Sequence, residues 1–374
     1  MMYRRALLWL SVLVLVTAAY IRPAHAAGEV GDGTPASCTF TALQTALAGG
    51  GLVTFNCGAN PLTITVSSTL SITAANTTID GSGLITLSGG GARRIIDVVT
   101  LGTNAITLTL QNLTLTAGRA VGMNEAANGG AIRIRDQSIG QDYPPTLNLN
   151  NVTFDDNDST LTSFSGAGLN AYDFGGGAVY AGAGIVNVTD STFIDNDSNN
   201  GAGGAIHILR SNLTISGSSF SNNTAIGSVP ANSQGGAIYM DGMRDASAIF
   251  SITDSSFTGG RSYNSGGAIY VNMYENSNVF SVDQSSFVDN QLIGGSGALG
   301  GAISGGSTNI GGSTGNAVIR ISNSLFANNS ARRSAAPLDG SGGALAFAQR
   351  ARITIANSTF TGNSALGSSF NANG

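Results

Sequence analysis

The chain has 374 residues and a formal net charge of −5, and only 10% of its residues are charged while 42% are hydrophobic. Every basic residue is an arginine. An acidic chain of this kind argues against nucleic acid or an anionic membrane surface as a partner. The apolar content argues against a disordered chain, because there is enough hydrophobic surface to form a packed core.

Residues 1–26 have the pattern of a secretory signal peptide. Two arginines precede an apolar stretch over residues 6–19, and Ala24–Ala26 reads Ala-His-Ala, a small-residue cleavage site. The alternative is a transmembrane anchor, but the apolar stretch is too short for one. No later segment reaches membrane-spanning length, so we expect no membrane anchor to be encoded in this sequence. We expect a secreted protein, extracellular or at the cell surface, with the outer membrane as one location.

The next segments predict a leader and a cap. Residues 27–37 are rich in Gly, Pro and Thr, and we expect this leader to be mobile. Residues 38–57 form the expected N-terminal cap. Phe40, Leu43 and Leu47 follow a helical spacing, a triple glycine ends that helix, and residues 52–56 alternate as a strand does. A short amphipathic helix of this kind would cover the open end of a solenoid.

Cys38 and Cys57 are the two cysteines of the chain. In an exported protein, a pair this close in sequence predicts one disulfide bond. Residues 58–128 follow as a run of short β-branched segments separated by Asn-, Asp- and Gly-rich turns. These segments predict the first coils of the solenoid.

From residue 129 onward the chain repeats a Gly-Gly-Ala-(Ile/Val/Leu) tetrapeptide. Copies begin at Gly129, Gly176, Gly203, Gly235, Gly266, Gly300 and Gly342. The spacing of about 27 to 47 residues is the range of solenoid repeats. A Gly-rich unit cannot bury its own apolar face and has to stack on a copy of itself. We assign residues 129–374 to these repeats and expect their C-terminal end to be uncapped.

A second motif, Phe-x-x-Asn, alternates strictly with the first. Its phenylalanines are Phe154, Phe193, Phe220, Phe257, Phe287, Phe326 and Phe360. Phe257 is followed by Gly260 where the others have Asn. Equivalent residues of a solenoid stack one rung apart, so we expect an internal ladder of Phe rings and a corner ladder of Asn amides.

The pattern inside each repeat predicts an all-β fold. The Gly-Gly-Ala motif opens one strand of period two, a second alternating run follows, and the Phe begins a third. Turn residues such as Asp190-Ser191 and Asp254-Ser255 stand between the second and third strands. Three strands and three corners per turn describe a right-handed parallel β-helix.

The paired tetrapeptides resemble the repeats of the chlamydial polymorphic outer-membrane protein family. The resemblance covers Gly129 to about Asn363, roughly two-thirds of the chain. It implies an exported β-helix displayed at a cell surface, with adhesion as the usual role. Members of that family carry a C-terminal membrane barrel, whereas this sequence ends within a repeat.

Enzymes that act on polysaccharides also use parallel β-helices, so an enzymatic function is the main alternative to a binding scaffold. Of the catalytic sequence motifs that a polygalacturonase-like hydrolase needs, only Asp155-Asp156 is present, and the chain has no lysine. We therefore expect no catalytic residues, no cofactor and no activity on pectin-like polymers. A lyase or glycoside hydrolase with an atypical site stays as the alternative. Convergence of three titratable side chains in one groove would favour it.

Metal binding is weighed on the acidic corner residues. Asp155, Asp156, Asp195 and Asp289 lie on an acidic ridge beside the expected Asn ladder. Oxygen ligands on adjacent corners suit Ca²⁺. A solvated acidic edge is the favoured interpretation, because no calcium-binding nonapeptide repeat is present. We expect no metal site.

A stripe of rings supplies the candidate ligand site. The residue after the Ile or Val of each Gly-Gly-Ala motif should point out of the core. On four consecutive rungs it is Tyr180, His207, Tyr239 or Tyr270. The stripe is interpreted in two ways: as rings that stabilise the sheet or lie under the loops, or as an exposed platform for sugar rings.

These observations predict a secreted or surface-displayed, non-enzymatic scaffold for adhesion or polysaccharide binding. Its expected partners are an extracellular polysaccharide or a host or cell surface. A purely structural extracellular spacer is the other alternative.

Overall fold

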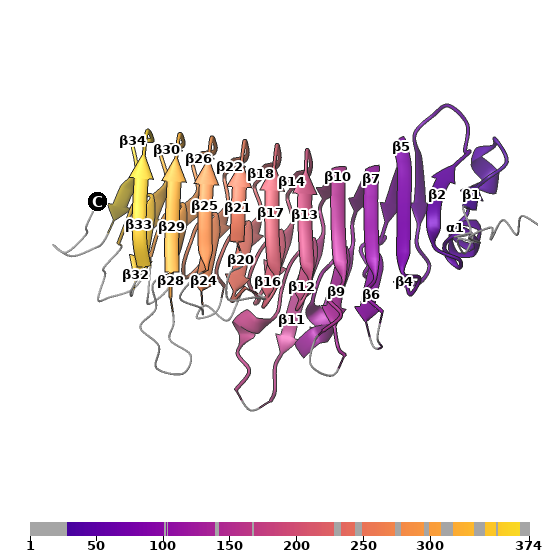
Figure 1. The fold of residues 1–374 in the computed structure, drawn as a ribbon, viewed down its shortest axis with the longest axis horizontal. Helices are drawn as coiled ribbons and strands as arrows, with labels where there is room; N and C mark the ends of the chain where they lie inside the picture. Colours follow the sequence, from indigo (N-terminus) through magenta and orange to yellow (C-terminus); the bar gives the residue numbers. More distant parts are fainter. Residues whose placement is uncertain are drawn as a thin grey trace, which may run out of the picture.

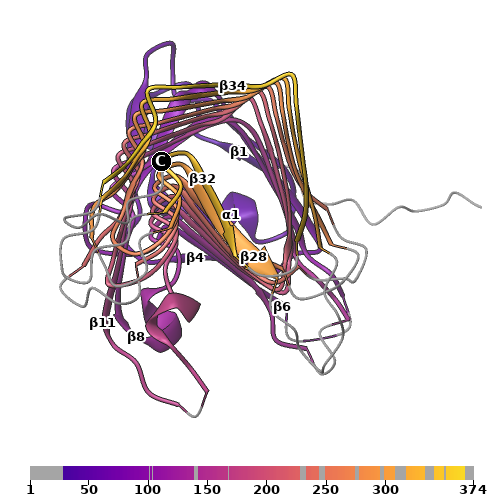
Figure 2. The ribbon, with the colours of Figure 1, turned by 90° about the vertical axis from the view of Figure 1, so that its left-hand side faces the viewer.

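A computed structural model shows an elongated parallel β-helix (Figure 1). It describes residues 28–366 apart from 101, 103, 139–141, 167, 228–232, 244–248, 274–277, 295–298, 308–316, 333–340 and 349–350. The expected signal peptide and the last eight residues of the chain lie outside the described residues. Seen from its C-terminal end, the chain turns counter-clockwise as it approaches the viewer, which makes the helix right-handed (Figure 2).

The longest sheet, sheet A, has 18 strands and bends around one corner of the helix. Its strands are β1 (Gly28–Val30), β2 (Gly51–Phe55), β3 (Leu62–Thr65), β5 (Asn76–Ser88), β7 (Thr107–Thr116), β10 (Thr146–Asp155), β13 (Ile185–Thr189), β14 (Thr192–Ile194), β17 (Asn212–Ser216), β18 (Ser219–Ser221), β21 (Ile249–Thr253), β22 (Ser256–Thr258), β25 (Val279–Asp283), β26 (Ser286–Val288), β29 (Ala317–Ser322), β30 (Leu325–Ala327), β33 (Ala351–Ala356) and β34 (Thr359–Thr361).

Sheet B has nine strands, each opened in the repeats by the Gly-Gly-Ala motif. They are β4 (Leu70–Ile72), β6 (Ile96–Thr100), β9 (Ile132–Asp136), β12 (Val179–Gly182), β16 (Ile206–Leu209), β20 (Ile238–Asp241), β24 (Ile269–Met273), β28 (Ile303–Ser307) and β32 (Leu345–Ala348).

Sheet C has eight short strands, each placed after the Phe-x-x-Asn corner in the repeats. They are β8 (Arg119–Met123), β11 (Asp158–Ser163), β15 (Asp197–Asn199), β19 (Thr224–Ala225), β23 (Arg261–Ser262), β27 (Gln291–Leu292), β31 (Ser330–Arg332) and β35 (Ser364–Leu366).

The expected parallel β-helix is confirmed, and each turn of the repeats also contains one short strand, in sheet C, that the repeat pattern did not include. One turn contains β12 in sheet B, β13 and β14 in sheet A, and β15 in sheet C. The strands of sheet C are as short as Thr224–Ala225, so they carry too few residues for an alternating pattern to be recognised.

The Phe ladder is confirmed as the core of the repeats. Ring centroids of successive members lie 4.6 to 4.9 Å apart and their planes differ by 2° to 7°. The stack consists of Phe154, Phe193, Phe220, Phe257, Phe287, Phe326 and Phe360. Phe360 is 41% exposed, because no described ring covers its second face.

The corner after each Phe carries the expected Asn ladder. The amide of Asn157 donates to Oδ1 of Asn196 at 2.9 Å, and Asn196 donates to Asn223 at 2.9 Å. Gly260 interrupts the ladder, but its backbone N–H donates to Oδ1 of Asn290 at 2.9 Å. The buried amides therefore satisfy one another along the axis, and each ties two rungs together.

The bend inside sheet A is made by the predicted turn residues. Asp190, Gly217 and Asp254 hold the left-handed conformation there, with φ between 47° and 57°. Gly, Asn and Asp are the residues that adopt it most readily. The hydroxyl of the serine that follows each of them accepts a hydrogen bond from the backbone N–H at the same position of the preceding rung, as Ser218 Oγ does from the Ser191 N–H at 3.1 Å.

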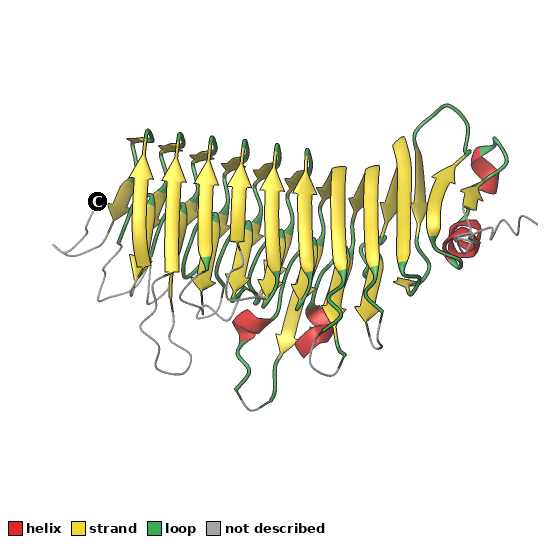
Figure 3. Cartoon of the chain, in the orientation of Figure 1, coloured by secondary structure: helices red, strands yellow, loops and turns green. Residues whose placement is uncertain are grey.

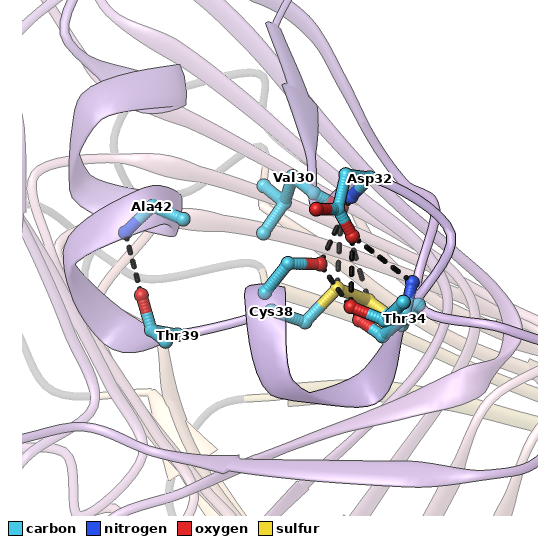
Figure 4. Close-up of a disulfide and its surroundings, with 8 residues drawn as sticks. Val30, Asp32, Thr34, Cys38, Thr39 and Ala42 are labelled. Atoms are coloured by element: carbon cyan, nitrogen blue, oxygen red, sulfur yellow. Dashed lines mark hydrogen bonds between the residues drawn. A yellow bond between two sulfur atoms is a disulfide. The ribbon is translucent and has the colours of Figure 1, made fainter.

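The N-terminal cap contains the expected helix and the expected disulfide, whereas the leader before it is not mobile as expected. Helix α1 (Phe40–Leu47) lies at the N-terminal end, with the Thr39 hydroxyl accepting a hydrogen bond from the Ala42 N–H (Figure 4). Cys38 and Cys57 are bonded, with Cα atoms 5.7 Å apart. Closing a loop of about 20 residues stabilises the fold by roughly 3 kcal/mol in the chain-entropy model.

The leader is ordered because its backbone extends the first coil. Strand β1 pairs in parallel with β2, so Val30 lies in the hydrophobic core. The 3-10 helix η1 (Pro35–Ser37) then leads into the cap. Within the described ranges, no helix is long and apolar enough to cross a membrane.

Candidate functional site

The ring stripe exists as a stack on the outer side of sheet B. Neighbouring ring centroids lie 5.0 Å apart for Tyr180 and His207, 4.8 Å for His207 and Tyr239, and 5.4 Å for Tyr239 and Tyr270. The parallel register of β12, β16, β20 and β24 places the four residues in one column. The alternation of each strand therefore gave the correct face.

The expectation that this stripe is exposed is wrong. Tyr180, His207 and Tyr239 are at most 4% exposed, and Tyr270 is half-buried. Sheet C and the segments that return from it lie over this side of sheet B (Figure 2). The ring of Tyr172, for example, lies 6.4 Å from that of Tyr239. Buried rings that stack on one another offer no open faces to a sugar, so a platform along the stripe is ruled out.

Burial also sets the ionisation of the stacked groups. It lowers the pKa of His207 to about 3, so the imidazole is neutral at physiological pH. It raises the pKa of Tyr270 to about 12, with the charge of Asp241 adding to the effect. The stack is therefore a neutral second core, and His207 is not a proton carrier.

Two long segments, which we call the excursions, project from sheet C beside the outer side of sheet B. The 3-10 helices η2 (Asn124–Ala127) and η4 (Ala171–Asp173) extend β8 and β11 away from the body (Figure 3). The Asn124 side chain donates to the Ser165 carbonyl and accepts from the Ser165 N–H, at 2.9 and 3.0 Å. The two excursions are thereby joined into one wall.

Arginines from sheet B and the preceding segment hold η2 in place. Arg94 donates to the carbonyls of Ala126, Asn128 and Gly129 at 2.6 to 3.0 Å. Burial, followed by the charge of Arg133, lowers the pKa of Arg94 to about 10. The wall is therefore fixed by hydrogen bonds to its backbone.

Arg133 makes a second attachment to the same wall. Its guanidinium forms two hydrogen bonds to the Asp97 carboxylate, at 2.6 and 2.8 Å, and donates to the Glu125 carbonyl at 2.9 Å. Arg135 forms an ion pair with the Glu125 carboxylate. Bidentate pairs of this kind fix orientation as well as position.

Between this wall and sheet B lies a cleft of about 650 Å³, which we call the arm cleft. Tyr180 and Leu209 contribute from sheet B, and Met123 and Leu169 from the excursions. A volume of this size is typical of ligand sites. Met123 and Leu169 are 47% and 40% exposed, which places two large apolar side chains at the mouth.

The floor continues into a smaller hollow of about 110 Å³ beside Gly182. Gly182 occupies a column in which neighbouring rungs have Arg135, Leu209 and Asp241. A Cβ there would lie 3.2 Å from the Tyr180 ring. The missing side chain leaves room for this hollow beside the Tyr180 ring, which is itself 4% exposed.

Carboxylates line the inner part of the arm cleft. Asp241 is buried and accepts a hydrogen bond from the Asn272 amide at 3.0 Å. Asp173 accepts one from the Asn170 N–H at 2.6 Å. Burial raises the pKa of Asp173 above its usual value, and the charge of Asp241 raises it further. With Glu125, three acidic side chains thus line one groove. This is the convergence of three titratable side chains that would favour the enzyme alternative.

One feature of the sequence indicates this site, namely the unequal spacing of the Gly-Gly-Ala motifs. The step from Gly129 to Gly176 is 47 residues, whereas the next step, to Gly203, is 27. The extra residues form the β11–η4 excursion. Asp173 and Leu169 belong to no repeat position, so only the unusual length of that repeat pointed to them.

The aspartates of the acidic ridge recur because their corner needs a left-handed backbone conformation. Asp156, Asp195 and Asp289 all hold left-handed conformations, with φ of 53° to 56°, in the corner that precedes the Asn ladder. Burial, then the charges of Asp156 and Asp195, raise the pKa of Asp155. Among the described residues, no group of three or more His, Cys, Asp or Glu side chains is placed to hold a metal ion.

A second hollow, of about 570 Å³, lies over the bend of sheet A. Its walls are corner residues and serines such as Ser218, Ser255 and Ser285. The hydroxyls of these serines accept hydrogen bonds from backbone N–H groups of the neighbouring rung. Because these hydroxyl groups already hydrogen-bond to the backbone, the arm cleft is the stronger candidate for a ligand-binding site.

Comparison with protein-family models gives no match, and neither does comparison with curated proteins. Among solved structures, the chain is similar to one described as PfbA, a surface adhesin of Streptococcus pneumoniae. The TM-score is 0.35 and the identity 11%, over 91% of this chain and 92% of that chain. A similarity at this level carries no argument about function. The resemblance of the repeats to the chlamydial family stays a prediction.

Proposed function

We propose that the protein is a secreted or surface-displayed β-helix scaffold that binds a polysaccharide in the arm cleft. The observation that carries the proposal is the cleft itself: exposed apolar side chains at the mouth and hydrogen-bonding carboxylates around one hollow. The disulfide supports a location outside the cytoplasm. Adhesion to a host or cell surface would follow if the polysaccharide belongs to that surface.

The chemistry of the lining suits sugar rings. A sugar presents apolar C–H faces and a rim of hydroxyl donors. Met123 and Leu169 offer apolar contact, while Asp173 and Asp241 can accept hydrogen bonds from hydroxyl groups. The wall is held by the arginines before any ligand arrives, so little ordering entropy is lost on binding.

The first test removes the apolar mouth. We expect the double variant Met123→Ala, Leu169→Ala to bind its glycan roughly thirtyfold more weakly, because each truncation removes about 1 kcal/mol of contact. The measurement is titration against the best ligand from a glycan array. The control is Leu52→Ala, Leu325→Ala, which truncates two other exposed leucines far along the helix. Equal binding by both double variants, or no glycan bound by the unaltered protein, would refute the proposal.

A glycoside hydrolase is the second candidate, favoured by one observation. Asp173 has a raised pKa and lies in the same cleft as Asp241, and hydrolysis of a glycosidic bond needs a protonated and an ionised carboxyl. We nevertheless expect no cleavage. The purified protein should release no reducing ends or unsaturated products from pectin or from its bound glycan. Products that disappear in Asp173→Asn, Asp241→Asn would establish the enzyme instead.

A further inference from the structure

Gly182 is a glycine that the fold does not require. It ends β12 without a positive φ, and the same column holds Arg135 on the rung before and Leu209 on the rung after. The three atoms nearest to an added Cβ all belong to side chains, the closest 3.2 Å away on the Tyr180 ring. A glycine in a strand costs conformational entropy and often marks a place where another group approaches closely. What this glycine leaves open is the hollow beside it.

The hollow beside Gly182 suits a substituent of a sugar rather than a whole sugar. Its volume is about 110 Å³. That is more than the roughly 30 Å³ of one water and less than the roughly 300–1,000 Å³ of pockets that hold entire ligands. Glu125, Tyr180, Leu209 and Arg210 line both the hollow and the arm cleft. A sugar in the arm cleft can therefore extend one substituent into the hollow.

The arginines of the hollow have donors to spare. Arg210 is exposed and forms no ion pair with any described residue. Arg135 is paired with Glu125, and its Nε is buried without a hydrogen-bond partner among the described residues. A guanidinium donates hydrogen bonds and accepts none. A group that enters the hollow therefore has to bring an acceptor.

A neutral acceptor fits the hollow better than an anionic one. Glu125 and Asp136 border the hollow, and Asp173 lines the adjoining cleft, so their charges oppose a carboxylate. Leu209 and Ala183 offer an apolar wall. The Glu125 carboxylate has lone pairs beyond those used in its ion pair, and these can accept from an N–H group. An acetamido group presents a carbonyl oxygen, an N–H and a methyl group together.

On these grounds, and resting on the proposed function, we infer that the arm cleft selects a polysaccharide of N-acetylated hexosamine. The sugar ring lies in the cleft, and its acetamido group enters the hollow beside Gly182. There the carbonyl oxygen accepts from Arg210, the N–H donates to Glu125, and the methyl group contacts Leu209.

The experiment compares two neutral ligands that differ only at C2 of each sugar. Calorimetric titration of the full chain at neutral pH uses the β-1,4-linked hexamer of N-acetylglucosamine and that of glucose. We expect the acetylated hexamer to bind at least about tenfold more tightly, the scale of one hydrogen bond to a charged group. A galacturonic acid hexamer is the third ligand, and it should bind more weakly than the acetylated hexamer.

Two variants test the hollow itself. Gly182→Leu fills it, and β12 should still form because the next rung holds Leu209 in the same column. Arg210→Asn removes the guanidinium from an exposed position whose left-handed conformation asparagine tolerates. In each variant the preference for the acetylated hexamer should fall to about twofold or less. Arg320→Asn, which removes an exposed arginine of β29, is the matched control and should keep the full preference.

Thermal unfolding shows which variants are folded, and Arg210→Asn decides if Gly182→Leu is not. Equal or tighter binding of the glucose hexamer, or a preference that survives in the folded variants, would overturn this inference and leave the proposed function standing. Tighter binding of the galacturonic acid hexamer would also overturn it, and would assign the hollow to a carboxylate. The same holds if another glycan binds and none of the three hexamers does. If no glycan binds at all, both proposals fail.

Discussion

Phe220→Ala is expected to lower the free energy of unfolding by about 3–5 kcal/mol, the range for a buried Phe whose removal leaves a cavity. Phe220 is stacked between Phe193 and Phe257, with centroid distances of 4.6 Å on both sides and interplanar angles of 2° and 5°. Truncation removes two ring contacts at once, and parallel strands fixed by backbone hydrogen bonds cannot close the gap.

The loss should be local, because each rung contacts mainly its neighbours. Hydrogen exchange should rise in β14, β18 and β22 and stay unchanged in β30 and β34. Phe164→Ala serves as the control, since Phe164 is exposed on an excursion and its loss should change stability by less than about 0.5 kcal/mol. Uniform deprotection of every rung in Phe220→Ala would contradict a solenoid of weakly coupled units.

The ladders could be predicted because a solenoid converts sequence position into spatial contact. Once Phe193 and Phe220 occupy the same place in successive repeats, stacking one above the other follows from the strand spacing alone. The Asn ladder follows in the same way, and so does its interruption at Gly260. The cap was predictable for a different reason, since Phe40, Leu43 and Leu47 fall on one helical face and a triple glycine ends the helix.

The arm cleft could not be predicted, because it is lined by residues of the excursions, which belong to no repeat position. Alternation correctly placed Tyr180 and Tyr239 on the outer side of sheet B, but alternation says only which residues share a face. It does not say what lies over that face. The covering came from sheet C, whose strands are too short to show a period. It also came from excursions whose direction is set by single contacts, such as those of Arg94 with the carbonyls of Ala126 and Asn128.

The two glycines of the repeated motif have different physical roles. The first, as in Gly203, has a positive φ of 68°, which a residue with a Cβ adopts only with strain. The second, as in Gly204, does not have a positive φ. It faces the carbonyl of Gly236 in the next rung and the carbonyl of Thr224 in sheet C. Its missing side chain is what lets sheets B and C approach each other.

Gly204→Ala should therefore destabilise the protein by steric overlap alone. The new methyl group would overlap both carbonyl oxygens, and both belong to backbone that hydrogen-bonds to neighbouring rungs. We expect a loss of at least about 3 kcal/mol in denaturant unfolding, the upper end of the range for overpacking. The matched control is Gly102→Ala, an exposed glycine with no described atom within 4 Å of an added Cβ. If the two variants unfold at the same denaturant concentration, close packing of sheets B and C is not the reason for the second glycine.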